Sequence, residues 1–282
     1  MDSRACVFLF PVDSAADIPG DFRASVQGRL FETGVFLPQD DANSFMAPPR
    51  YPARLLLLND HSLYIVPHPT AQQPTAELIL DELAQLETGT SLLAGWIQFS
   101  TRSVKHHLIY NTRASRPLEK FIAAVRRRWL GTPSEPSQSA KFRPQIFGQE
   151  LNVKLRNLLH DELGLDEVVL SQYFAAPAEN QDKFLVFRRI TWRPGHLLVL
   201  TSGHRLLWLK DEYRGRCNRY AGIAISVRSS SLLECFRLEK TSYDDLVMHF
   251  ASGLSWRISI CGADSDCAGF LRTLNCVLHL ES

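Results

Sequence analysis

Two groups of basic side chains have the residue types needed to bind an anion. One group lies in "LLWLKDEYRGRCNR" and consists of Lys210, Arg214, Arg216 and Arg219. The other is the arginine triplet Arg126–Arg128. A guanidinium group can hold phosphate or carboxylate through two parallel hydrogen bonds. These residues are therefore the candidate anion- or partner-binding residues of the chain.

Each group also has a structural explanation. Asp211 and Glu212 lie inside the first group, so that stretch also fits a solvated loop. Arg126–Arg128 fall in the last turn of a predicted helix, where cations interact favourably with the negative helix end. The wider span 101–130 holds eight basic residues against Glu119 alone. Such a span would attract acidic lipid headgroups or an acidic partner.

An acidic N-terminal segment could neutralise this basic span from within the chain. Residues 1–49 contain seven Asp or Glu residues and three Arg residues. Pairing between this segment and residues 101–130 would hide the cations from an external ligand. The sequence leaves both arrangements open.

Patterns typical of catalysis or metal binding are weak. His106 and His107 are adjacent, so a strand would point them to opposite faces. The sequence contains no Gly-rich phosphate loop and no nucleophile-elbow or zinc-protease motif. The six cysteines show no metal-binding spacing. We interpret them as small buried residues of a protein in a reducing compartment, and a Cys261–Cys267 disulfide is the alternative. We expect no cofactor and no enzymatic activity, and an uncharacterised hydrolase is the distant alternative.

The overall composition is that of a globular protein. The chain has 282 residues, of which 45% are hydrophobic and 22% charged, and this length suffices for about two domains. A net charge of +1 excludes polyanion binding by bulk charge. Aromatic residues near the basic span occupy predicted core positions, so nucleic acid is not an expected partner. No apolar run is long enough for a membrane span, and "ACVFLF" is too short for a signal peptide. We expect a cytoplasmic protein, either free or peripheral to a membrane.

One segment of the chain occurs twice in similar form. "PARLLLLNDHSLYIV" begins at Pro52 and "PGHLLVLTSGHRLLWL" begins at Pro194, 142 positions later. In each, a turn dipeptide, Asn59-Asp60 or Ser202-Gly203, separates two apolar runs and predicts a strand, a turn and a strand. The first run of each pair does not alternate with polar residues, which indicates a strand buried on both faces.

Two amphipathic helices are predicted, one at the end of each half. Their apolar residues share the spacing i, i+3, i+4, i+7, i+11 and lie 149 positions apart. Ser115 and Asp264 are the expected N-caps. The two apolar faces are Leu118, Phe121, Ile122, Val125 and Trp129, and Cys267, Phe270, Leu271, Leu274 and Leu278.

Weaker helical patterns precede both repeated segments. Leu151, Leu155 and Leu159 share one helical face, and Gly164 is a plausible C-cap. Upstream, the spacing of Phe22, Val26 and Leu30 predicts a further helix, which Gly28 weakens.

The repeat predicts a tandem of two α+β domains. Several short β-type runs precede each C-terminal helix, and a stretch rich in Pro and Ser joins the halves. We expect a first domain over residues 1–130 that includes an N-terminal extension. A linker over 131–145 and a second domain over 146–282, preceded by a short helix, should follow.

The order of six or seven short strands and one helix resembles the pleckstrin-homology-like (PH-like) fold. The stretch "GHLLVLTSGHRLLWLKDEY" is similar to the second and third strands of such a domain, and "LETGTSLLAGWIQF" resembles the middle of bacterial PH-like domains. The resemblance covers about residues 52–130 and 193–278. It implies two domains, each a bent antiparallel sheet or partly open barrel of about seven strands capped by a C-terminal α-helix. Another small barrel or sandwich with a terminal helix is the structural alternative.

The resemblance also implies a binding role. PH-like domains bind phosphoinositides, peptides or other proteins, and fold alone does not identify the ligand. We expect a non-enzymatic interaction or adaptor protein with a protein partner; the alternative is peripheral binding to anionic membrane lipids. Phosphoinositide-binding PH domains carry their basic residues in the first hairpin, whereas Lys210, Arg214 and Arg216 follow the predicted third strand.

Overall fold

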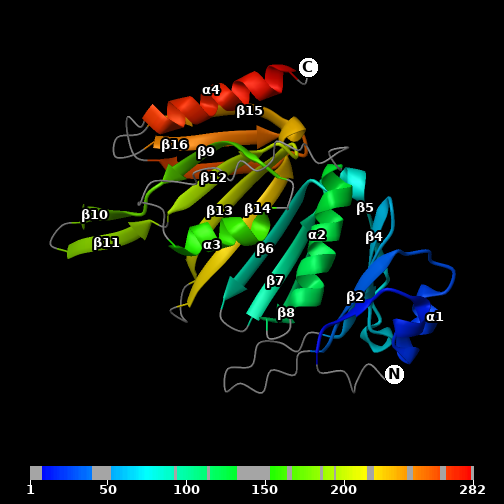
Figure 1. Ribbon diagram of the computed structural model, residues 1–282. Coiled ribbons are helices and arrows are strands. Elements are labelled where there is room, and N and C mark those ends of the chain that lie inside the picture. Colours follow the sequence, from blue (N-terminus) through cyan, green and yellow to red (C-terminus); the bar gives the residue numbers. More distant parts are fainter. Residues whose placement is uncertain are drawn as a thin grey trace. The chain divides into compact units, whose positions relative to one another are not determined.

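Antiparallel sheets and four described α-helices form an α+β fold, as the sequence predicts (Figure 1). None of the sheets formed by the described strands closes into a barrel. The computed structural model describes residues 8–39, 52–91, 94–112, 115–131, 153–163, 167–184, 187–193, 195–214, 219–239, 244–260 and 265–280.

The chain divides into two compact units, and each is described by itself. The first unit comprises residues 1–83, 92–97 and 105–132, and the second comprises residues 84–91, 98–104 and 133–282. Two short segments of the first half of the sequence therefore belong to the unit of the second half. The predicted linker 131–145 lies, apart from Gly131, outside the described residues.

The first unit contains a five-stranded antiparallel sheet in the order β1-β2-β3-β4-β5. All four residues of the "LLLL" run, Leu55–Leu58, are fully buried, which confirms a strand covered on both faces. The predicted turn follows, because the Asn59 side chain accepts hydrogen bonds from the backbone of His61 and Ser62. The strands are β1 (Phe10–Val12), β2 (Thr33–Leu37), β3 (Arg54–Leu58), β4 (Ser62–Pro67) and β5 (Ala76–Ile79).

Helix α2 (Arg116–Leu130) confirms the first predicted amphipathic helix. All five of its predicted apolar residues are buried. The indole N–H of Trp129 donates to the carbonyl oxygen of Leu83 at 2.8 Å and fixes the end of the helix. Ser115 occupies the predicted N-cap position, but the expected capping bond is not formed: its backbone angles are helical, and its hydroxyl contacts Glu119 instead.

The N-terminal helical segment is shorter than predicted. It consists of the 3₁₀ helix η3 (Gly20–Phe22) and α1 (Arg23–Val26), and both Phe22 and Val26 lie in the core. Leu30 is 85% exposed, so its predicted place on the same face is wrong. The helix already ends at its C-cap Gln27, whose ψ of 129° is not helical, and Gly28 follows with a positive φ of 80°.

The second unit contains strands from both halves of the sequence. Strands β6, β14, β13, β12 and β9 are hydrogen-bonded in that order, β15-β16-β17 form a three-stranded sheet, and β10 pairs with β11. β7 is divided between the units, and β8 belongs to the first. The bounds are β6 (Gln85–Ser91), β7 (Ala94–Ser100), β8 (Lys105–Asn111), β9 (Val169–Ala175), β10 (Ala178–Phe184), β11 (Phe187–Arg193), β12 (His196–Thr201), β13 (Arg205–Arg214), β14 (Arg219–Arg228), β15 (Leu232–Leu238), β16 (Asp244–Phe250) and β17 (Ser255–Ile260).

Two helices cover the sheets of the second unit. Helix α3 (Val153–Glu162) lies across β13 and β14 in Figure 1, and its Leu155 and Leu159 belong to the same core cluster as Leu197 and Val199 of β12. Helix α4 (Ser265–Leu280) confirms the second predicted amphipathic helix and contacts β9. The expected caps Asp264 and Gly164 lie outside the described residues, as does Leu151.

The described helices and cysteines bear on two further predictions. No described helix combines the length and apolar character required to cross a membrane. Cys267 is buried and is not part of a disulfide, which contradicts the alternative of a Cys261–Cys267 bond. Its position within the apolar face of α4 explains the burial.

Candidate functional site

The outer face of α2 carries a stripe of exposed cations. Arg116, Lys120 and Arg127 are all exposed and have no ion-pair partner among the described residues. At 3.6 residues per turn, the three residues lie within about 40° of one another around the helix axis and extend over about 16 Å. The buried face of α2 lies on the opposite side. We call Arg116, Lys120 and Arg127 the α2 stripe.

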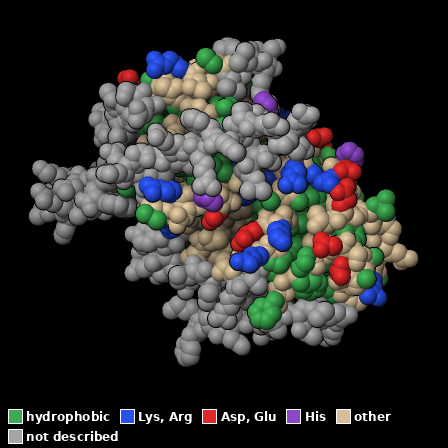
Figure 2. Space-filling model, viewed as in Figure 1, with side chains coloured by type: hydrophobic (Ala, Val, Ile, Leu, Met, Phe, Trp, Pro, Cys, Tyr) green, Lys and Arg blue, Asp and Glu red, His purple; other side chains and the backbone are tan. Residues whose placement is uncertain are grey.

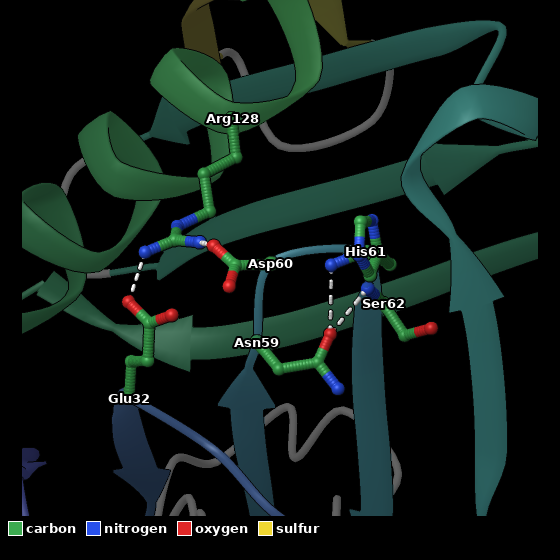
Figure 3. A network of polar contacts seen from close by, with 6 residues as sticks. All are labelled: Glu32, Asn59, Asp60, His61, Ser62 and Arg128. Atoms are coloured by element: carbon green, nitrogen blue, oxygen red, sulfur yellow. Dashed lines mark hydrogen bonds and ion pairs between the residues drawn. The ribbon is translucent and has the colours of Figure 1, made fainter.

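Arg128 points to a different side of α2 and is already paired. Figure 3 shows its guanidinium group between the carboxylates of Glu32 and Asp60, with an ion pair to each. Glu32 belongs to the acidic N-terminal segment, so this pair is one instance of the internal neutralisation that the sequence left open. The Asn59 turn, closed by bonds of 2.9 Å from His61 N and 2.6 Å from Ser62 N, sets the position of Asp60.

The predicted triplet Arg126–Arg128 therefore does not act as one group. Arg126 is half-buried on the flank of α2 opposite to Arg128, and only Arg127 is exposed. Consecutive helical residues point about 100° apart, so three neighbours cannot share one face. In Figure 2, cationic and acidic side chains lie close to one another on the face in view.

Lys210 lies on an aromatic cluster of the second unit. Its Nζ is 4.9 Å from the centre of the Trp208 ring, a cation–π contact. Trp208 also lies 5.4 Å from the ring of Trp256 and donates to the imidazole of His196. The ammonium group is thus held against the protein surface.

The other members of the Lys210 group are separated from it along the strand. Arg214 and Arg219 are register partners at the end of the β13–β14 ladder, where only the backbone is described. Arg216 lies outside the described residues. The structure therefore brings Arg214 and Arg219 together in register and places Lys210 several residues away.

A buried arginine was not anticipated from the sequence. Arg205, at the start of β13, is fully buried and donates to the carbonyl oxygen of Glu162 and to the Glu167 carboxylate, both at 2.7 Å. Glu162 accepts from Thr88 of β6 at 2.9 Å, and Glu167 accepts from Thr201 of β12 at 2.8 Å. The network joins the end of α3 to three strands of one sheet.

The chemistry of the Arg205 network is structural. Both carboxylates are engaged by hydrogen-bond donors, and the cation between them is shielded from solvent. A sequence signal existed, because Arg205 directly precedes the apolar run "LLWL". However, only the chain path shows that Glu162 and Glu167 meet it there.

Histidine, cysteine and acidic side chains are the possible metal ligands among the described residues. No group of three or more His, Cys, Asp or Glu side chains in this part of the chain could hold a metal ion. His106 is half-buried and His107 is exposed, which agrees with their predicted places on opposite faces of a strand. Burial, reinforced by the nearby Arg54 cation, lowers the pKa of His106.

Comparisons with known proteins add no family. Neither the scan of protein-family models nor the search of curated proteins finds a match to this sequence.

Proposed function

We propose that the protein is a non-enzymatic interaction module built from two PH-like domains, one in each half of the sequence. The observation that carries this proposal is a repeated order of elements. In each half of the sequence, four strands, a three-residue 3₁₀ helix, three strands and an α-helix follow one another. The two series are β2, β3, β4, β5, η5, β6, β7, β8, α2 and β9, β12, β13, β14, η8, β15, β16, β17, α4.

Corresponding elements of the two series have similar spacing along the chain. β3 and β12 begin 142 positions apart, η5 (Leu80–Glu82) and η8 (Ser229–Ser231) 149 positions apart, and α2 and α4 also 149 positions apart. The pattern has two departures: the β10–β11 hairpin is inserted between β9 and β12, and the 3₁₀ helix η4 (Pro69–Ala71) lies between β4 and β5. Seven strands followed by a helix in each series support the PH-like assignment, and PH-like domains act as binding modules.

Affinity capture tests the interaction function. The immobilised full-length chain is expected to retain a specific protein from a native lysate, identified by quantitative mass spectrometry. Two linked modules can bind one partner more tightly than either module alone if their sites are engaged together. An unrelated protein of similar size and charge is the control. Retention of the same proteins by the control, and of nothing else by the chain, would contradict the proposal.

The α2 stripe supports a second candidate function, peripheral binding to anionic membranes. Three exposed cations that have no ion-pair partner in the described part of the chain lie on one face of a helix, and they fit a negatively charged surface. Each cation near such a surface contributes about 1 kcal/mol, so replacing all three by Gln should weaken binding by about 3 kcal/mol, or about 150-fold.

Vesicle sedimentation separates the two functions. Phosphatidylserine vesicles should retain the chain at low salt and release it as ionic strength rises, because salt screens exposed charges. Arg128→Gln is the matched control, since Arg128 is engaged with Glu32 and Asp60 and its loss should weaken vesicle binding little. Absence of binding to these vesicles at low salt would exclude the membrane function and leave the first proposal standing.

A further inference from the structure

The junction between β6 and β14 joins two elements of the repeat that do not correspond to each other. The five register pairs of this junction run from Gly222↔Thr90 to Ser226↔Leu86. In the repeat, β14 is the counterpart of β5, because each immediately precedes a three-residue 3₁₀ helix. β6 is the counterpart of β15, because each follows that helix. The junction thus joins a β5-type strand to a β6-type strand.

The two remaining counterparts, β5 and β15, are both edge strands. Among the described strands, β5 pairs with β4 alone, and β15 pairs with β16 alone. In a tandem array, each terminal repeat has a neighbouring repeat on one side only. Here the exposed halves are complementary in type, since one is a β5-type edge and the other is a β6-type edge.

Backbone alternation directs the free groups of β5 outward. Leu80 N donates to His61 O, and its counterpart Ser229 N donates to His204 O, both at 2.8 Å. Successive residues of a strand direct their backbone groups to opposite edges. The backbone N–H and C=O groups of Glu77 and Ile79 therefore point away from β4. Ser226 is the counterpart of Glu77, and its backbone groups point toward β6 in the same way.

Strand β15 has the surface of an edge that accepts another strand. Leu233 is 68% exposed, and Phe236 and Leu238 are each 40% exposed. The strand contains neither Pro nor Lys, which commonly protect edges, and its Arg237 is bonded to Asp244 of β16. On the other edge, Ile79 of β5 is 43% exposed. Glu234 is 62% exposed and the ladder to β16 is irregular between Leu232 and Glu234, so the start of β15 is protected and the part from Cys235 to Leu238 is the candidate for strand addition.

We propose that β15 of one copy of the chain pairs antiparallel with β5 of a second copy, repeating the β6–β14 junction between molecules. The second copy is favoured over an unrelated peptide because the chain itself carries both halves of a junction that it already forms once. Shifting the observed register by 149 positions gives the pairs Thr75↔Arg237, Ala76↔Phe236 and Glu77↔Cys235. The small Ala76 then faces the large Phe236 ring. This inference uses the duplication on which the proposed function rests, but it does not depend on any external partner.

The proposed contact is head-to-tail. Each copy in a pair would keep one free β5 or one free β15, so association can continue beyond a dimer or close into a ring. Full-length protein should therefore show a sedimentation coefficient that rises with concentration past the value for a monomer.

Complementary edge variants test the proposal. Glu77→Pro blocks β5, because it removes a backbone N–H that is directed away from β4, and the double substitution Phe236→Lys with Leu238→Lys blocks β15. Each blocked variant alone should sediment as a monomer, whereas an equimolar mixture should form a dimer and nothing larger, because one intact β5 and one intact β15 remain. Leu30→Lys, at an exposed apolar residue outside the strands, is the control and should associate like the unmodified chain.

A second β15 variant guards against loss of folding. Leu233→Lys with Leu238→Lys is measured alongside the first double substitution, and near-ultraviolet circular dichroism identifies which variants retain native packing. A full-length chain that stays monomeric at its highest soluble concentration would overturn the inference, as would a mixture of folded blocked variants that stays monomeric. Either result would leave capture of a foreign protein, and hence the proposed interaction function, untouched.

Discussion

Replacement of Arg205 by Met should destabilise the second unit more than replacement of any exposed cation. Arg205 has 1% side-chain exposure, and its partners Glu162 and Glu167 have 8% and 15%. Met keeps much of the side-chain volume but removes the positive charge and its hydrogen bonds. Two carboxylates would then remain in a poorly solvated site without their cation. Removal of one partner from a buried ion pair costs about 3–5 kcal/mol.

Lys154→Met is the matched control for this substitution. Lys154 of α3 pairs with Asp211 of β13 at 2.6 Å, but its side chain is 39% exposed. An exposed ion pair contributes about 0–1 kcal/mol. The two variants therefore remove one cation each from the contact between the same helix and the same strand, and differ in burial.

Urea denaturation and native-state hydrogen exchange together measure the effect. Denaturation gives the loss of unfolding free energy, and faster exchange of amides in α3 and β13 assigns the loss to this contact. Arg205→Met should lower the free energy of unfolding by about 3–5 kcal/mol. A loss no larger than that of Lys154→Met would refute the reasoning that burial makes this network important for stability.

Three further predictions concern single side chains. Trp129→Ala should lower the free energy of unfolding, measured by urea denaturation, by about 3–5 kcal/mol because Trp129 is 1% exposed. Trp129→Phe keeps an aromatic ring and loses the bond to Leu83, so it should lower this free energy by less; equal losses would contradict the prediction. Burial, and to a smaller extent Arg54, holds the pKa of His106 below 6.5, so the unfolded chain binds the proton first and the stability of the fold should fall as pH falls through 6.5. Arg54→Gln should raise the pKa of His106 measured by NMR, and an unchanged pKa would argue against Arg54 as a cause. Burial, with a smaller contribution from Cys267, raises the pKa of the Cys235 thiol from 9.0 to about 12. The protonated thiol therefore stabilises the folded state below pH 9, and this contribution is lost as pH rises toward 12. Iodoacetamide at pH 8 should label the exposed Cys276 well before Cys235.

The candidate site was only partly accessible from the sequence. The residue types at Arg126–Arg128 correctly indicated a basic helix, but helical geometry divides the triplet and groups Arg127 with Arg116 and Lys120. The prediction that Lys210 and Arg214 follow the third strand in a solvated loop is wrong, because β13 continues through Arg214; the contact of Lys210 with Trp208 follows from residues that share one face of β13. Alternation along a helix or a strand is a local property, so careful use of it could have found both groupings.

The sequence by itself determined the local elements and their repetition. The apolar faces of α2 and α4 and the fully buried run Leu55–Leu58 follow from hydrophobic spacing, because periodicity reflects which side of an element must be buried. The turn at Asn59 follows from its own side chain. Such features depend on residues that are close together in the chain.

Only the tertiary structure decided which distant segments meet. The pairing of β6 with β14, the burial of Arg205 between Glu162 and Glu167, and the capture of Arg128 by Glu32 and Asp60 join residues far apart in the sequence. A strand edge offers the same backbone donors and acceptors to any partner, and a cation can pair with any carboxylate that reaches it. The path of the whole chain therefore selects these partners, and no local pattern encodes the choice.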